Sequence, residues 1–315
     1  MSRAREFVRV MTIGLMMGAA EVVPGVSGGT IAFISGIYEK LVNAIRQFNP
    51  YILLRLKREG IAAVWHDVDA GFLLILFGSM GVSILLFASG ISFLLHNEPI
   101  AIWSFFFGLV VASSLVVSRE ITGFGLDIGI AAGIGVGVGI VITQLIPIEL
   151  EPTPLMLFLG GSVAICAWIL PGLSGSFILL ILGLYGFVIE AIKTLDFVNL
   201  ALVGAGSIVG LVSFSQVLAR LFSHYKNETL AVLTGFMLGS LGKLWPWKNT
   251  LSYQIQPDGG QIPLAQEAVT PDVYTSLTGE PAEIGLAVIC VIAGGVLVLL
   301  LDWIARISDG RQNST

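Results

Sequence analysis

Charged residues are scarce in this sequence. Asp, Glu, Lys and Arg make up 12% of its 315 residues, whereas hydrophobic residues make up 55%. Soluble domains carry roughly 25% charged residues, so this chain has too little polar surface for a water-soluble globule. The net charge of -5 is small and dispersed, which argues against nucleic acid as a partner.

Cysteine and histidine are also rare. The two cysteines, Cys166 and Cys290, lie in separate apolar stretches, and the three histidines, His66, His96 and His224, fall in predicted loops. None of them has a metal-ligating spacing. The sequence therefore predicts neither a metal site nor a cofactor, and both cysteines are interpreted as apolar packing residues.

The chain does contain long uncharged apolar runs. A helix of about 20 apolar residues crosses the hydrocarbon core of a bilayer. Five runs come close to this length or exceed it, and a sixth is interrupted only by one lysine near its end: 71–95, 100–118, 128–148, 199–219, 284–301 and 229–247. The predicted fold class is an all-α integral membrane protein.

The sequence repeats one apolar hairpin. PGVSGGTIAFISGIYEKLVNAI, which begins at Pro24, aligns without a gap with PGLSGSFILLILGLYGFVIEAI, which begins at Pro171. These copies are 147 residues apart, whereas Gly78-Ser79 matches Gly206-Ser207 at a spacing of 128. The first half therefore carries 19 additional residues, in a segment that mixes basic and apolar side chains. Such a mixture is typical of an amphipathic helix on the membrane surface.

Two related halves follow from this repeat, and we expect them to form one membrane domain. Each half is predicted to contain a broken, re-entrant hairpin and three transmembrane helices. The first half covers residues 1–148, with its hairpin over 10–45 and an interfacial helix over 49–66. The second covers residues 149–315, with its hairpin over 152–192 and an extracytoplasmic loop over 249–281.

The distribution of positive charge predicts the topology, because cytoplasmic loops are enriched in Lys and Arg. If each hairpin returns to the side that it entered, 13 of the 16 basic residues fall on the N-terminal side. Only Lys193, Lys243 and Lys248 then face the opposite side. This arrangement places both termini in the cytoplasm and makes the halves antiparallel, which is the inverted-repeat plan of many transporters.

Each hairpin is interrupted by a Pro-Gly-x-Ser-Gly motif. Proline lacks the amide hydrogen that a helix needs, so the helix should stop near Pro24 and Pro171 and restart after the Ser-Gly pair. Paired breaks of this kind, with glycine amides and hydroxyls, indicate a transport site for an anion such as phosphate. A tight corner packed between helices is the alternative interpretation. The candidate phosphate ligands are Pro24, Gly25, Ser27, Gly28, Gly29, Thr30, Pro171, Gly172, Ser174, Gly175 and Ser176.

Glu21 lies three residues before the first motif in an otherwise apolar run. An intramembrane carboxylate is costly and indicates a functional role, so Glu21 is the candidate for proton or ion coupling. A cap on a neighbouring broken helix is the alternative. Its equivalent in the second half is Trp168, which means that the halves are not interchangeable.

Four basic residues at predicted helix ends are candidate contacts for a charged headgroup. Snorkelling of their side chains to the bilayer surface explains them equally well. These residues are Arg119, Arg220, Lys243 and Lys248.

Three segments, GAAEVVPGVSGGTIAFISGIYEKL, WILPGLSGSFILLILGLY and GFMLGSLGKLWPWK, give the chain its resemblance to a known family. It resembles the bacterial polyprenyl-phosphate (undecaprenyl-phosphate) translocases over essentially its whole length. The resemblance implies a multi-pass protein of the bacterial cytoplasmic (inner) membrane, which returns undecaprenyl phosphate from the outer to the inner leaflet for envelope synthesis. It also implies that both motifs surround the phosphate. Where relatives often have Asp before the first motif, this chain has Glu21.

Two other functions remain open from the residues alone. One is an ion-coupled transporter of a small soluble anion. The other is a lipid phosphatase with Ser27 or Ser174 as nucleophile, but such chemistry needs a base within reach, and the histidines fall in loops. We therefore expect a transporter rather than an enzyme, with the bilayer and the lipid phosphate as partners and homo-oligomerisation left open.

Overall fold

A computed structural model describes residues 3–22, 27–49, 51–123, 125–145, 151–255 and 261–310. The chain is mostly helical, as its composition predicts. The helices of the first half are α1 (Arg3–Glu21), α2 (Gly28–Ile34), α3 (Tyr38–Arg46), α4 (Ile52–Glu59), α5 (Ile61–Asp67), α6 (Ala70–Asn97), α7 (Pro99–Ser118) and α8 (Leu126–Gln144).

The second half contains seven α-helices, one 3-10 helix and two strands among its described residues. These elements are α9 (Pro154–Ile169), α10 (Gly175–Ile181), α11 (Tyr185–Lys193), α12 (Phe197–His224), α13 (Lys226–Ser240), the 3-10 helix η1 (Leu241–Leu244), β1 (Lys248–Ile255), β2 (Gln261–Ala268), α14 (Pro271–Thr278) and α15 (Ile284–Gly310).

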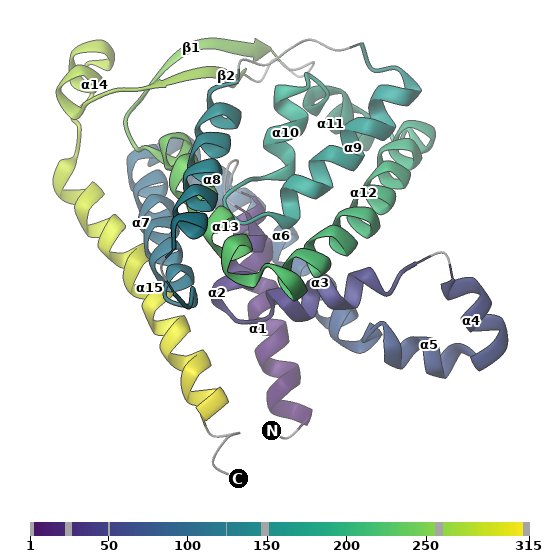
Figure 1. Cartoon of the computed structure of the whole chain (residues 1–315). Coiled ribbons are helices and arrows are strands. Elements are labelled where there is room, and N and C mark those ends of the chain that lie inside the picture. The colour runs from purple at the N-terminus through teal and green to yellow at the C-terminus, as the bar shows by residue number, and fades with distance from the viewer. Residues whose placement is uncertain are drawn as a thin grey trace.

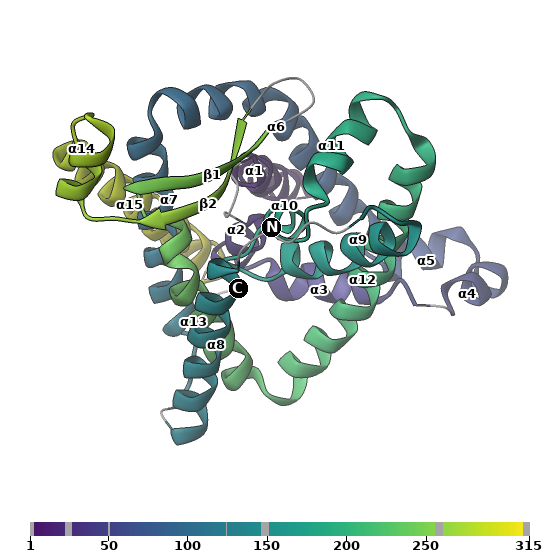
Figure 2. The ribbon, with the colours of Figure 1, turned by 90° about the horizontal axis from the view of Figure 1, so that it is seen from above.

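Five helices of the described chain are long and apolar enough to cross a membrane: α6, α7, α8, α12 and α15. These match five of the predicted spans. The sixth, α13, has 15 residues and continues into η1. In Figure 1, α1 begins and α15 ends at the same end of the molecule, and the strands and α14 cover the opposite end. Figure 2 looks down on that covered end and shows the strands lying across the bundle.

Both helix breaks lie where the proline motifs predict them. The helix α1 ends at Glu21 and α2 begins at Gly28, while α9 ends at Ile169 and α10 begins at Gly175. A second break was not predicted: α2 is separated from α3 by Gly36, and α10 from α11 by Gly183, each with φ +70°. The bend between α10 and α11 is 112°.

The two halves share their element lengths. Helices α2 and α10 each have 7 residues, α3 and α11 each have 9, and α6 and α12 each have 28. The bounds of α6 and α12 differ by 127 residues, so the spacing of 128 taken from Gly78-Ser79 is wrong by one. The additional segment of the first half therefore has 20 residues rather than 19.

Glycines let helices of opposite halves approach closely at two equivalent places. A Cβ on Gly108 of α7 would collide with the Val291 carbonyl of α15, and a Cβ on Gly135 of α8 would collide with the Val232 carbonyl of α13. The backbones of α7 and α15, and those of α8 and α13, are therefore in close contact, as small residues permit in membranes. Gly14 similarly brings α1 against α6.

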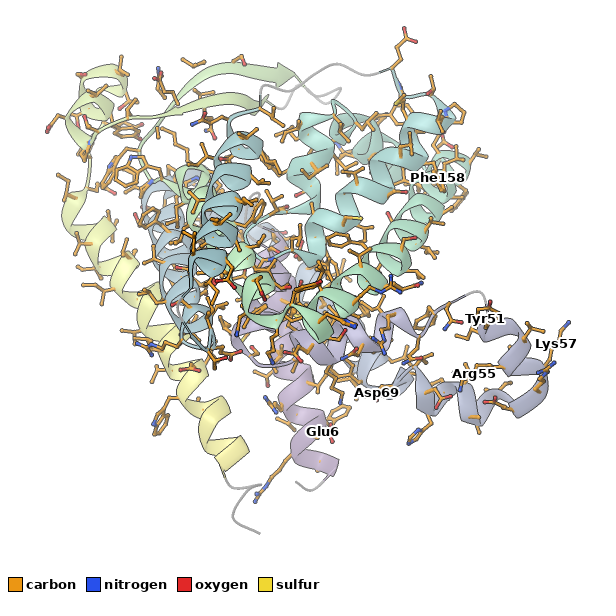
Figure 3. The ribbon with its side chains drawn as sticks, in the orientation of Figure 1. Glu6, Tyr51, Arg55, Lys57, Asp69 and Phe158 are labelled. Carbon is orange, nitrogen blue, oxygen red and sulfur yellow. The ribbon has the colours of Figure 1, made fainter. Side chains whose placement is uncertain are left out.

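The interfacial helix predicted over 49–66 is two helices. Gly60, with φ +82°, ends α4 and precedes α5. This left-handed backbone conformation is open to glycine and breaks the helical hydrogen bonding. Figure 3 shows Tyr51, Arg55 and Lys57 on this arm, which projects away from the bundle beside the end where the N-terminal helix begins.

The predicted all-α class is wrong for the loop over 249–281. Strands β1 and β2 pair antiparallel there, from Lys248 opposite Ala268 to Ile255 opposite Gln261, and α14 follows. Strand β1 contains the β-branched residues Thr250 and Ile255 and the aromatic Tyr253, which are residue types that favour strands. The loop thus contains regular structure, and most of its described residues are exposed to solvent.

Candidate functional site

The two helix breaks meet in the interior. Ser27, fully buried, donates its hydroxyl to the carbonyl oxygens of Trp168 at 3.0 Å and Leu170 at 3.1 Å. These carbonyls belong to the last turn of α9, whose final carbonyls have no partner within the helix. Ser27 therefore supplies the missing donor and caps a helix of the other half.

A second bond runs between the breaks. The backbone N–H of Gly172 donates to the hydroxyl oxygen of Thr30 at 3.0 Å, and Thr30 is fully buried. Gly172 has φ +91°, a conformation that favours glycine. The two motifs are thus in direct hydrogen-bond contact, well within the reach that a shared anion site requires.

Glycine permits this contact. A Cβ on Gly29 would lie 2.9 Å from the carbonyl oxygen of Ile169 and 3.1 Å from that of Trp168. A Cβ on Gly175 would lie 2.7 Å from the Ala164 carbonyl oxygen. A larger residue at position 29 would push the two breaks apart, and one at position 175 would push α10 away from α9 of the same hairpin.

Glu21 caps the first broken helix. Its carboxylate accepts a hydrogen bond from the backbone N–H of Gly28 at 2.5 Å, and the Trp168 side chain is its other partner. Glu21 and Trp168 are equivalent positions of the two halves, and they lie together. The capping alternative for Glu21 thus describes this conformation, and the carboxylate occupies the place of an anion at the start of α2.

The structure places the other motif residues around this junction. Pro171, Ser174 and Gly175 are buried, and the hydroxyls of Ser174 and Ser176 lie 2.6 Å apart. Pro24 and Gly25 lie outside the described residues. Many of the hydroxyl and amide groups of the breaks therefore form hydrogen bonds within the protein.

Two of the candidate lysines lie over aromatic rings, and one of these rings belongs to the helix that follows the second break. Lys243 in η1 places its Nζ 4.7 Å from the ring centroid of Phe177 in α10. Lys248, at the start of β1, places its Nζ 3.2 Å from the ring centroid of Trp103 in α7. Sequence reasoning named both lysines but missed the aromatic partners, because nothing in the sequence indicates that these rings lie beneath the ammonium groups.

The other two candidate cations lie elsewhere. Arg119 is exposed at the end of α7, and Trp103 lies near the start of the same helix. At 1.5 Å per residue, these positions are about 24 Å apart along the axis. Arg220 is also exposed, in the last turns of α12. The four basic residues therefore do not form one site.

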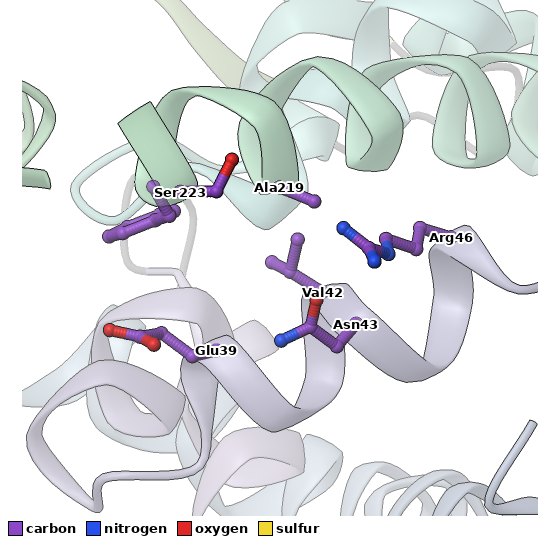
Figure 4. Close-up of a pocket in the computed structure, with 7 residues that line it drawn as sticks. Glu39, Val42, Asn43, Arg46, Ala219 and Ser223 are labelled. Atoms are coloured by element: carbon purple, nitrogen blue, oxygen red, sulfur yellow. The ribbon is translucent and has the colours of Figure 1, made fainter. Parts of the chain in front are cut away.

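An aromatic cluster joins α2, α3 and α12 toward the end of the molecule where α1 begins. The ring of Tyr38 lies 4.8 Å from that of Phe33 and 5.7 Å from that of Phe222 in α12. Lys226 and Glu39 form an ion pair of 2.7 Å next to it. Beside this contact lies a cavity of about 260 Å³ between α3 and α12, lined by Arg46 and Asn43 among others (Figure 4).

Comparisons with known proteins fit this architecture. Residues 17–262 match the family described as undecaprenyl phosphate translocase-like. A polyprenyl-phosphate transporter of Vibrio cholerae is 46% identical over 289 residues, covering 92% of this chain and 94% of the relative. A polyprenyl-phosphate transporter of Staphylococcus aureus is 31% identical over 265 residues, covering 74% of this chain and 84% of the relative. No solved structure matches the chain.

Proposed function

The chain belongs to the undecaprenyl phosphate translocase-like family, and on that premise we propose that it transports polyprenyl phosphate through a bacterial cytoplasmic membrane. The substrate of this proposal is undecaprenyl phosphate, moved from the outer to the inner leaflet so that the carrier can be reused in envelope synthesis. Both curated relatives are named polyprenyl-phosphate transporters, which supports a transporter rather than an enzyme.

One observation carries the proposal: the two broken hairpins meet through Ser27, Thr30 and Gly172. A flippase must shield a phosphate from hydrocarbon while the prenyl tail stays in lipid. Irregular backbone at membrane depth can do this because its N–H groups and hydroxyls replace water. In this proposal the tail passes through a lateral opening between the two repeats.

The proposed topology is an inverted repeat with both termini in the cytoplasm. Its supports are the positive-charge bias and the arrangement in Figure 1. There α1 and α3 lie toward the end of the termini, and α9 begins and α11 lies toward the covered end. In this topology each hairpin enters from one side of the membrane and returns to it.

Asymmetry between the halves supports transport by rocking. In the first half α3 packs against α12, and Tyr38 is buried. The equivalent helix of the second half, α11, has a half-buried Tyr185 and no comparable packing on α6 within the described residues. We interpret this as a closed cytoplasmic side and a looser outer side. In the inward-facing state we expect the reverse, with α11 packed on α6 and α3 separated from α12.

Glu21 is the proposed coupling group. Its carboxylate already binds the Gly28 amide, so a substrate phosphate competes with it for the same kind of donor. Protonation or binding of a cation would weaken this hydrogen bond and make the amide available to the phosphate. Transport would then depend on the proton or ion that neutralises Glu21.

Reconstituted liposomes test the function. Fluorescent or radiolabelled undecaprenyl phosphate is placed in one leaflet, and its appearance in the other is followed with an impermeant quencher or phosphatase. We expect acceleration over protein-free vesicles, competed by excess undecaprenyl phosphate. Competition by water-soluble phosphate or carboxylate at similar concentration would instead support a transporter of small soluble anions. No acceleration would refute the proposal.

A further inference from the structure

The buried ammonium group of Lys248 makes no hydrogen bond with any of the residues that the structure describes. Its Nζ lies over the face of Trp103. A cation–π contact offsets only part of the cost of removing a charge from water. Within the described part of the chain, no carboxylate forms an ion pair with Lys248 or with Lys243.

Two tryptophans next to Lys248 in the sequence hold this segment by hydrogen bonds and ring contacts. The indole N–H of Trp245 donates to the Val269 carbonyl, and that of Trp247 donates to the Ala282 carbonyl, each at 2.8 Å. The rings of these two tryptophans lie 5.5 Å apart, and Phe107 packs edge-on against Trp245 at 5.7 Å. The segment that presents both lysines is thereby fixed to the loops flanking α14.

The other lysine, Lys243, lies close to the contact between the two helix breaks. Lys243 lies over Phe177, a residue of the short helix that follows the second break. A Cβ on Gly172 would lie 3.0 Å from the hydroxyl of Ser240, directly before η1. Lys243 therefore lies beside the second break, and Lys248 follows five residues later in the chain, where the first strand of the cover begins.

We propose that Lys243 and Lys248 form the site that recognises a phosphate monoester on the outer side before it reaches the breaks. A phosphate monoester carries about -1.5 to -2 charges at neutral pH, which matches two ammonium groups. Aromatic side chains around them exclude water and strengthen the attraction. This inference rests on the proposed function and specifies where the substrate headgroup first binds.

The same chemistry fits a lipid headgroup and free phosphate, so the experiment separates these sources. The full-length protein in nanodiscs is titrated with labelled undecaprenyl phosphate, with undecaprenol, which lacks the phosphate, and with inorganic phosphate. The variants are K243M, K248M, the double variant and the charge-retaining pair K243R and K248R. Lys57→Met is the matched control because Lys57 is an exposed lysine on the α4 arm.

We expect the double variant to bind undecaprenyl phosphate about 10- to 100-fold more weakly, as loss of charge-assisted contacts predicts. Undecaprenol binding should stay unchanged, and the Arg variants should retain most of the affinity. Inorganic phosphate that binds as tightly as the lipid would identify free phosphate as the ligand of the lysines. Undiminished phosphate binding by a folded double variant would overturn the inference, leaving the lysines as anchors of the cover.

Failure of the proposed function gives a different pattern. A wild-type protein that moves undecaprenyl phosphate, with equal binding by wild type and double variant, refutes the lysine site alone. A wild-type protein that neither binds nor moves the lipid refutes the function, and inorganic phosphate binding then tests the lysines directly. Thermal unfolding of each variant establishes that it is folded.

Discussion

The hydroxyl of Ser27 lies 3.0 Å from the carbonyl oxygen of Trp168, which is 141 residues away in the sequence. Through this bond a serine of one break closes the end of a helix that leads to the other. An unsatisfied carbonyl at this depth is costly because no water is available to replace the donor. The bond therefore couples the two halves at the point where each helix is broken.

Replacing Ser27 with Ala removes the only side-chain donor to these carbonyls among the described residues. We expect the free energy of unfolding to fall by about 1–3 kcal/mol and transport to slow. Thermal or denaturant unfolding in detergent and the liposome assay measure the two effects. Ser118→Ala is the control, since the Ser118 hydroxyl bonds only within its own exposed helix end. Equal stability of the two variants would contradict the capping role.

Substitution of Gly29 tests the close approach of the breaks. A Cβ there meets the backbone carbonyls of Trp168 and Ile169, so Gly29→Ala should separate the breaks, lower stability by about 1–3 kcal/mol and reduce transport. Gly78→Ala is the control, because a Cβ at Gly78 in α6 meets nothing within 4 Å. That change should be neutral or gain up to about 1 kcal/mol from helix propensity. Similar losses in both variants would contradict this packing.

The helix breaks and the membrane spans could be predicted from the sequence, because a proline and the length of an apolar run act on the local backbone. The breaks at Pro24 and Pro171 and five of the spans follow from the residues alone. The bends at Gly36 and Gly183 were missed, because a glycine in a membrane helix is common and its φ depends on what surrounds it.

The contacts of the site were not predictable in the same way. Sequence spacing identified Ser27 and Lys248 as candidates, but their partners lie 141 and 145 residues away. Which groups bond to each other depends on how the helices pack. The motifs predict an anion site, with a tight corner packed between helices as the alternative. The structure shows Ser27, Thr30 and Gly172 of these motifs hydrogen-bonded between the two halves.

Two substitutions of Glu21 distinguish its role as a helix cap from its proposed role in coupling. Glu21→Gln keeps an oxygen that accepts from the Gly28 amide but removes the charge, whereas Glu21→Ala removes both. We expect the Gln variant to keep the wild-type unfolding free energy within about 0.5 kcal/mol and to lose the dependence of transport on a proton or sodium gradient. The Ala variant should lose about 1 kcal/mol more, as lost helix caps do. Gradient-dependent transport by a folded Gln variant would exclude Glu21 as the coupling group.

Crosslinking tests the closed contact at the end of the termini. Glu39 and Lys226 form an ion pair of 2.7 Å between α3 and α13. Cysteines at both positions, in a chain with Cys166 and Cys290 replaced by Ala, should react with a short bifunctional reagent and stop transport. A cleavable reagent should restore it on reduction, and the single-cysteine variants provide the controls. Unchanged transport in the crosslinked protein would mean that this contact does not open during the cycle.

The pH dependence of stability tests the state of Lys248. Burial, together with the charge of Lys243, holds the pKa of the Lys248 ammonium well below its ordinary value. The folded protein then binds fewer protons than the unfolded chain, whose lysine pKa is about 10.4, so stability rises with pH between the two values. Burial of the Lys248 ammonium lowers the free energy of unfolding by its full amount below the pKa of the folded state. This loss disappears as the pH approaches the pKa of the unfolded chain.

Lys248→Met should therefore be more stable than wild type near neutral pH, with a difference that shrinks as the pH is raised toward 10. Denaturant unfolding across this range measures the difference, and Lys57→Met should show no such trend. A bound phosphate monoester favours the charged ammonium, so saturating ligand should reduce the advantage of the variant at neutral pH. A variant less stable than wild type at neutral pH would mean that Lys248 stabilises the fold in place, and the need for an anionic partner would disappear.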